Sequence, residues 1–132
     1  MDSGFVDDLR QLLAPIEDVA EVRWATSSGG VSSVSVKPHK QAALPCSVAW
    51  SDHETVIGLG EHRRLELGPE KSDQRLALDI IASIINGSVS ADRDPAGGRI
   101  CVALESGELL CDPPVPKRRA NHLTLAALAP YR

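Results

Sequence analysis

The sequence predicts an α+β protein: an antiparallel sheet of about five to seven strands with a core helix, in the order α-βββββ-α-ββ-α. Two observations predict this class. Apolar residues recur at helical spacing in one segment near the N-terminus and in another after Gly68. Between these segments they alternate with polar residues, and short glycine-containing loops interrupt the alternation. We expect residues 1–132 to form a single domain, because this length is common for one domain.

The first element is predicted to be a helix that begins near Ser3 and ends near Ala14. Its apolar residues fall three or four positions apart, namely Phe5, Val6, Leu9, Leu12, Leu13 and Ile16. Ser3 can cap the first turn. Pro15 disfavours helical backbone in the residue before it, so the helix should stop there.

Five antiparallel strands are predicted to follow. A three-residue loop at 28–30 would place Val22 opposite Val36 and supply a glycine for the left-handed position of the loop. Turns at 52–53 and 60–62 would continue the chain as a meander. The residues expected on the core face are Ala20, Val22, Trp24, Val34, Val36, Leu44, Cys46, Val48, Trp50, Ile57, Leu59, Leu65 and Leu67.

Residues 69–86 are predicted to form the core helix, which covers one face of the sheet. Pro69 is favoured in a first helical turn, and Asn86-Gly87 can close the helix with a left-handed cap. The apolar residues form a wide stripe, namely Leu76, Ala77, Ile80, Ile81, Ile84 and Ile85.

A second hairpin is predicted after the core helix. A turn at Ser106-Gly107 would set Val102 opposite Cys111 and leave Cys101 on the other face of the sheet. Because a disulfide needs both side chains on one face, this register excludes a bridge between these two cysteines. We expect all three cysteines of the chain to be reduced thiols that pack as small apolar residues.

Loops and proline dominate the remaining segments. Residues 90–98 are expected to be a loop that leads into the second hairpin. Residues 113–119, rich in proline and basic side chains, are expected to be an extended connector. Asn121 can cap a short last helix that runs through Leu128 and ends before Pro130.

The composition argues against several classes of protein. A net charge of -4 argues against a dedicated nucleic-acid binder, because duplex affinity comes mainly from neutralised phosphates. The chain starts without a basic region followed by an apolar stretch, so no secretory signal is expected. No apolar run approaches the ~18 residues of a membrane span. Three cysteines without a C-x-x-C spacing favour a reducing compartment, and we expect a cytoplasmic protein.

No constellation of residues predicts catalysis, a metal or a cofactor. His53 and His62 lie at opposite ends of one predicted strand, too far apart to bind a common metal ion. We therefore predict no catalytic residue, no metal and no cofactor. The alternative is a small enzyme or ligand-binding domain with a pocket between sheet and helices that uses His53, Glu54 or Glu61.

The sheet face opposite the core carries small residues where a solvated sheet would usually carry long charged ones. We name Ser33, Ser35, Ser47, Ala49 and Cys101 as partner-binding residues, and Val56 and Ala103 share the face in the expected register. Such a face can lie flat against another surface. Three outcomes are open: the first helix covers it, a partner protein or a second copy covers it, or it is exposed.

The order of elements and the acidic pI of about 5.5 resemble the class I chaperones of type III secretion and similarly folded small bacterial proteins. The segment 97–110 looks like their second hairpin. The resemblance implies a dimer that cradles another protein. The chain departs from that pattern in having five strands before the core helix instead of about three, and a shorter last helix.

The sequence therefore predicts a non-catalytic protein-binding module: a chaperone-like, inhibitor-like or immunity-type partner of another protein. Three features support this function. They are the absence of a catalytic constellation, the small-residue sheet face, and the opposite charge of the acidic N-terminal and basic C-terminal ends.

Overall fold

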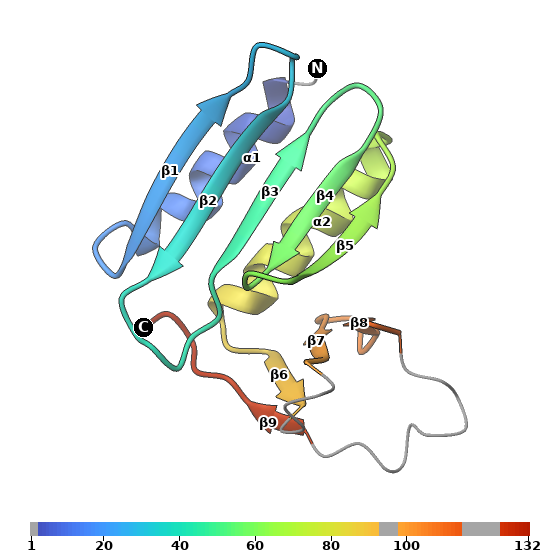
Figure 1. Cartoon of the computed structure of the whole chain (residues 1–132). Helices are drawn as coiled ribbons and strands as arrows, with labels where there is room; N and C mark the ends of the chain where they lie inside the picture. The colour runs from blue at the N-terminus through green and yellow to red at the C-terminus, as the bar shows by residue number, and fades with distance from the viewer. Residues whose placement is uncertain (1–2, 93–97, 115–124) are drawn as a thin grey trace.

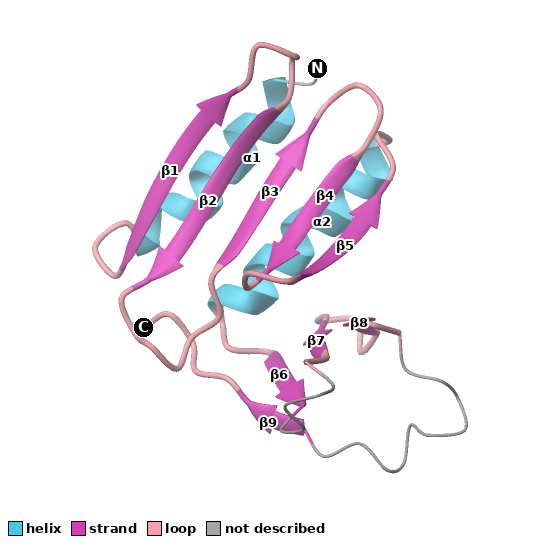
Figure 2. Cartoon of the chain, in the orientation of Figure 1, coloured by secondary structure: helices cyan, strands magenta, loops and turns pink. Residues whose placement is uncertain are grey.

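In the computed structural model, which describes residues 3–92, 98–114 and 125–132, these ranges form two antiparallel sheets and two α-helices (Figure 1; Figure 2). The α+β class and the antiparallel pairing predicted from the sequence are confirmed. The elements are α1 (Ser3–Leu13), the 3-10 helix η1 (Ala14–Ile16), β1 (Ala20–Thr26), β2 (Ser32–Pro38), β3 (Cys46–Trp50), β4 (Thr55–Leu59), β5 (Arg63–Leu67), α2 (Lys71–Ile85), β6 (Val89–Asp92), β7 (Ile100–Ala103), β8 (Leu109–Asp112) and β9 (Leu125–Ala127).

The first sheet is a meander of five strands in the order β1-β2-β3-β4-β5. Its register is the predicted one: Val22 pairs with Val36, and Val48 pairs with Ile57. Gly30 closes the first hairpin with a φ of 82°, a conformation that residues with a Cβ rarely adopt. Buried residues alternate with partly or fully exposed ones along β2, β3 and β4, and this alternation agrees with the predicted pairing.

Both α-helices cover the same face of this sheet (Figure 2). The Phe5 ring of α1 packs edge-on against Trp50 of β3, with ring centroids 5.4 Å apart. Ile80 and Ile84 of α2 are fully buried in the same apolar cluster as Val48 of β3. The core predicted around the second helix is present, and α1 packs against the same face of the sheet, next to α2.

The two ends of α2 are held as its sequence suggests. The backbone N–H of Glu70 donates to Asp73 Oδ2 over 3.2 Å at the N-terminus. At the C-terminus Gly87 takes a φ of 82°, and its N–H donates to the carbonyl of Ile84 over 3.1 Å. These caps let α2 stop sharply, and the chain then turns into the second sheet.

The second sheet has the strand order β8-β7-β6-β9. Ser90 of β6 pairs with Cys101 on one side and with Ala127 of β9 on the other. The sequence prediction missed β6, which lies inside this sheet, and β9, which lies at its edge. It assigned residues 90–98 to a loop, although β6 continues to Asp92, and it assigned the segment around Leu125 to a helix.

The predicted last helix is wrong for the residues that the structure describes, because Leu125–Ala127 is a strand. Its proposed cap, Asn121, lies outside the described residues, as does most of the connector predicted at 113–119. Leu125–Ala127 is a short apolar run, and such a run fits a strand or a helix equally well until its neighbour is known. The neighbour here is β6, far away in the sequence.

The β7–β8 hairpin is shifted by one residue from its predicted register. Ala103 pairs with Leu109, and Val102 pairs with Leu110 instead of Cys111. The cause is the turn: Gly107 has a φ of 94° and closes a three-residue loop between Leu104 and Glu108. A one-residue shift moves every side chain of one strand to the other face.

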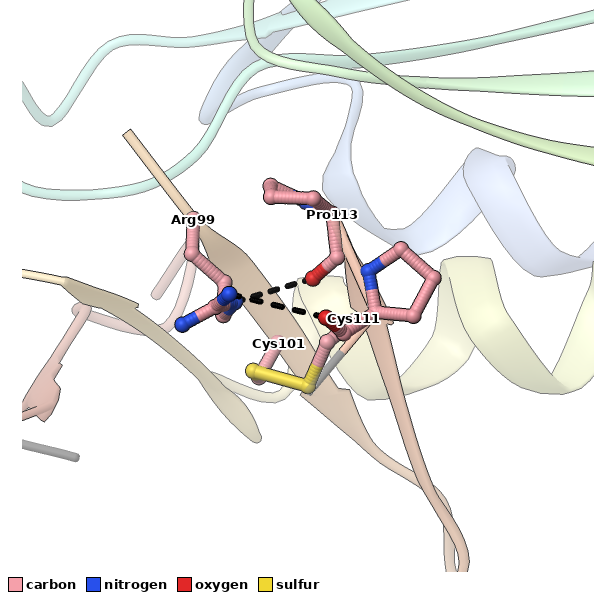
Figure 3. Close-up of a disulfide and its surroundings, with 5 residues drawn as sticks. Arg99, Cys101, Cys111 and Pro113 are labelled. Carbon is pink, nitrogen blue, oxygen red and sulfur yellow. Dashed lines mark hydrogen bonds between the residues drawn. A yellow bond between two sulfur atoms is a disulfide. The ribbon is translucent and has the colours of Figure 1, made fainter. Parts of the chain in front are cut away.

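This shift brings Cys101 directly opposite Cys111, and the two form a disulfide with their Cα atoms 4.1 Å apart. The prediction that all three cysteines are reduced is therefore wrong. Cys46, which is buried, is the one free cysteine. Figure 3 shows the bridge beside Arg99, whose Nε donates to the carbonyl of Pro113 over 2.9 Å. The disulfide removes the reason to expect a reducing compartment, and the cytoplasmic location stays a prediction.

The last residues of the chain tie the two sheets together. Leu128 N–H donates to the carbonyl of Val89 in the second sheet over 2.9 Å. Tyr131 is buried, and its hydroxyl donates to the carbonyl of Leu44, next to the first sheet, over 2.5 Å. One apolar cluster includes residues of both sheets. Among the described residues, no helix has the length and apolar character needed to span a membrane.

Candidate functional site

The face of the first sheet that points away from the helices is uncovered. In the described part of the chain, both helices lie behind the sheet and the second sheet lies beyond one end of it (Figure 1). The alternative in which the first helix covers the small-residue face is therefore wrong. We call this uncovered surface, built from β1 to β5, the open face.

Four of the five predicted partner-binding residues meet on the open face. Ser35 pairs with Ser47, and Ser33 pairs with Ala49, so the four side chains form a compact group on β2 and β3. Ser35 is exposed and the other three are partly exposed. Their proximity follows directly from the alternation in the two strands, which the sequence showed.

The fifth predicted residue, Cys101, does not belong to this surface. It lies on β7 in the second sheet, it is fully buried, and it is bonded to Cys111. Ala103, which was expected to share the face, is on the same second-sheet strand. The sequence prediction joined the second hairpin to the same sheet as the first five strands, and the structure separates them.

Across the five strands, the small residues form a floor between two charged edges. One row runs from Arg23 through Ser35, Ser47 and Gly58 to Arg64. The next row runs from Ala25 through Ser33, Ala49 and Val56 to Glu66. In these two rows the long side chains are therefore on β1 and β5, and the three middle strands present short ones. Lys37 of β2, which pairs with Glu21, lies outside the two rows.

Gly58 has no side chain, and the Ser47 side chain occupies the space beside its Cα. A Cβ at this position would collide with Ser47 Oγ from the adjacent strand. Ser47 thus leans over Gly58, and the centre of the floor is close to the backbone. A glycine in a strand interior often marks a place where another group approaches the backbone closely.

The charged edges of the open face are internally paired. On β1, Arg23 Nη2 lies 2.5 Å from Glu21 Oε1. On β5, Arg64 Nη2 lies 3.1 Å from Glu66 Oε1. Exposed pairs like these contribute little to stability, so their charges are available to a partner at small cost. The sequence prediction did not name them, although the alternation that places Ser35 and Ser47 on this face also places Arg23 and Arg64 there.

A hollow of about 490 Å³ opens at the end of the open face where the β4–β5 turn lies. Charged side chains of both signs line it, namely Glu21, Arg23, Lys37 and Glu61, together with Ser35, Ser47 and Gly60. Glu61 is one of the three residues named for the enzyme alternative. His53 and Glu54, the other two, are exposed in the β3–β4 turn at the opposite end of the strands.

The structure therefore does not bring the three residues of the enzyme alternative together. The space between the first sheet and its helices is filled by apolar side chains, including Leu9, Ile57 and Ile80. Within the described ranges, no group of three or more potential ligand side chains could hold a metal ion.

Cys46 is the one free thiol, and its surroundings make it chemically inert at neutral pH. Burial raises the pKa of Cys46 to about 11, against an opposing contribution from its hydrogen bond with Tyr131. The Sγ atom lies 3.4 Å from the Tyr131 hydroxyl oxygen. Because only the thiolate is a good nucleophile, this cysteine does not act as one near neutral pH.

Comparison with known proteins adds no family to this description: no protein-family model, curated protein or solved structure matches the chain. The open face, with its floor of small residues between paired charges, is the candidate site that the structure itself provides.

Proposed function

We propose that the protein is a non-catalytic protein-binding module and that the open face of the first sheet is its docking surface. One observation carries the proposal: both helices cover the same face of the sheet, which leaves Ser33, Ser35, Ser47 and Ala49 together on the uncovered one. Contact with another apolar surface would release water from this floor. Few long side chains would have to be ordered there, so the entropic cost of association is low.

The dimensions of the floor suit a helix of the partner protein. The edge strands β1 and β5 are separated by four strand spacings, roughly 19 Å. A helix with its side chains has a diameter of about 10–12 Å. A helix that runs along β3 would therefore lie on the small residues, between the charged pairs on the two edges.

The charges on the edges define the matching surface of that helix. Its central stripe should be apolar and its flanks polar, because Arg23 and Arg64 lie on either side of the floor at the level of Ser47. Acidic residues on both flanks of the helix would meet these arginines. Paired charges at the rim of an interface favour the correct partner and orientation more than they increase affinity.

The enzyme or ligand-binding alternative has less support. It needs a pocket between sheet and helices, and the apolar core occupies that space. The hollow near Glu61 lies on the open face instead, within the surface that we assign to the partner. A chaperone-like role, as the resemblance to the type III secretion chaperones implies, is one form of the proposed function.

Arginine substitutions on the floor test this proposal. Ser47→Arg and Ala49→Arg each place a long charged side chain where a partner helix would lie. Each should abolish capture of a protein partner from the source organism by the tagged chain, because a desolvated, unpaired charge costs several kcal/mol. Both variants should keep the parent melting temperature, since the two side chains point away from the core.

Gln11→Arg is the matched control, because Gln11 is exposed on α1, on the other side of the sheet. It should capture the same partner as the parent protein. If the floor variants capture that partner as well as the control does, the open face is not the docking surface.

A further inference from the structure

The two edge strands of the first sheet, β1 and β5, differ in what their outer backbone groups bond to. At β5, the backbone N–H of Arg64 donates to Asp112 Oδ2 of the second sheet over 2.9 Å. At the other edge, β1 pairs only with β2 among the described strands. β1 is seven residues long and has neither a proline nor a bulge, and its two charged side chains, Glu21 and Arg23, are of opposite sign.

The hydrogen bonds at both ends of β1 show which of its groups point outward. Val19 O accepts from His39 N over 2.9 Å, and Ser27 N donates to Val31 O over 2.8 Å. In an antiparallel pair such bonds recur at every second residue. The odd-numbered residues of β1 therefore bond to β2, and the N–H and C=O groups of Ala20, Val22, Trp24 and Thr26 point to the outer edge.

We propose that a second copy of this chain pairs with this edge, β1 against β1 in antiparallel orientation, with the two-fold axis at Val22. In this register the outward groups of Val22 meet those of Val22 in the second copy, and Ala20 meets Trp24. All of these are residues whose N–H and C=O groups point outward. Antiparallel pairing about a two-fold axis joins the β1 edge of one copy to the β1 edge of the other, so neither β1 edge remains open.

Charge selects this register among those that the backbone allows. With the axis at Val22, Glu21 faces Arg23 of the second copy, and Arg23 faces its Glu21. These are pairs without direct backbone bonds, in which side chains approach most closely. An axis at Glu21 would set two glutamates against each other, and one at Arg23 would set two arginines against each other. Like charges directly opposite destabilise a sheet, whereas opposite charges stabilise it.

The apolar side of the strand agrees with the same register. Val22 and Trp24 of this strand point toward the helix side of the sheet and are only partly buried. The Trp24 ring contacts the guanidinium of Arg10, 4.8 Å from the ring centroid, and the ring of Trp50, with centroids 6.5 Å apart. Opposite Ala20 of the second copy, the large ring would lie beside a small side chain.

The inference rests on the edge of β1 and not on the floor of small residues, and it shares only Arg23 with the proposed docking surface. If both hold, the dimer joins two five-stranded sheets into one sheet of ten strands, and the two open faces form one continuous surface.

Sedimentation equilibrium of the purified full chain tests the inference, with exchange of the two charges as the variable. The parent protein should dimerise. Glu21→Arg and Arg23→Glu alone should each weaken the dimer at least about tenfold, because both facing pairs become repulsive. An equimolar mixture of these two variants should form a heterodimer, since each arginine then faces a glutamate. The double variant E21R/R23E should dimerise like the parent.

Val22→Pro removes an outward N–H and no bond to β2, so the variant should remain a monomer. Because proline also replaces the partly buried Val22 side chain, a circular dichroism spectrum like that of the parent should show that the monomer is folded. Ser47→Arg, which tests the docking surface, should leave the dimer intact and thereby separates the two proposals. A monomeric parent at millimolar concentration would overturn the inference. So would single charge variants that dimerise as the parent does, or a mixture of them that forms no heterodimer.

Discussion

At the scale of single residues, the buried contact between Cys46 and Tyr131 links the end of the chain to the first sheet. The Tyr131 hydroxyl donates to the carbonyl of Leu44 and lies 3.4 Å from Cys46 Sγ. Burial raises the pKa of Tyr131 well above its ordinary value, and the nearby Cys46 raises it further. Both groups are neutral in the folded protein, which makes the contact sensitive to alkali.

The Cys46 thiol should make the protein less stable as the pH rises. In the unfolded chain the thiol ionises near its ordinary pKa of 9.0, whereas in the folded chain it ionises only near about 11. Below pH 9 both states keep the proton and the thiol contributes no pH dependence. Between these values the unfolded state releases the proton first, so the free energy of unfolding should fall, by on the order of 2–3 kcal/mol at most.

Urea unfolding measured across this pH range would check the effect. Cys46→Ala removes the thiol and leaves only a small cavity, so its free energy of unfolding should fall less steeply with pH than that of the parent. Tyr131 still contributes to the fall in this variant. Equal slopes for the two proteins would show that the Cys46 thiol is not protected from ionisation in the folded state.

At the scale of elements, the success of the sequence prediction depended on how local the pairing was. The strands β1 to β5 follow one another through short turns, so alternation alone placed Val22 against Val36 and Val48 against Ile57. β6 and β9 pair with each other across a long stretch of chain. Nothing within either short segment identifies its partner, and the prediction failed for both.

The candidate site was also predictable only where the strands that form it are neighbours in the sequence. Ser33, Ser35, Ser47 and Ala49 lie on adjacent strands of the meander, and the structure brings them together as predicted. The prediction places Cys101 on the same face because it joins the second hairpin to the first sheet, and the structure puts that hairpin in the second sheet. One residue in the turn decides what Cys101 pairs with: with Gly107 closing a three-residue loop, Cys101 faces Cys111.

The disulfide that results from this register can be tested by alkylation. The intact protein, denatured without a reductant and treated with iodoacetamide, should gain one alkyl group, at Cys46. The other two cysteines are bonded to each other and cannot react. After reduction, all three should be alkylated. Three alkyl groups without a reductant would show that Cys101 and Cys111 are reduced thiols, as the sequence predicts, and would contradict the disulfide.

At the scale of the whole molecule, part of the charge asymmetry between the two ends is used within the chain. Arg132 Nη2 lies 2.7 Å from Asp18 Oδ1 and also donates to the carbonyl of Pro15. The opposite charges of the two ends, which favour a protein partner when only the sequence is considered, thus partly pair with each other. Lys117, Arg118 and Arg119 lie outside the described residues. The case for protein binding therefore depends on the open face.

The layout of the molecule explains why that face is available. Two helices on one side of the first sheet provide the apolar core, and the second sheet continues that core at one end. Neither lies over the residues of the open face. The fold is therefore complete without the docking surface, and substitutions there can change binding without changing stability.

The most direct test of the docking surface is photo-crosslinking from its floor. A benzophenone side chain introduced at Ala49 would project from the open face, and the same group at Gln11 would project from α1 on the other side. In an extract of the source organism, the Ala49 position should give a discrete crosslink to one partner protein, and the Gln11 position should not. Identical crosslinks from both positions, or a discrete crosslink from Gln11 alone, would contradict the account.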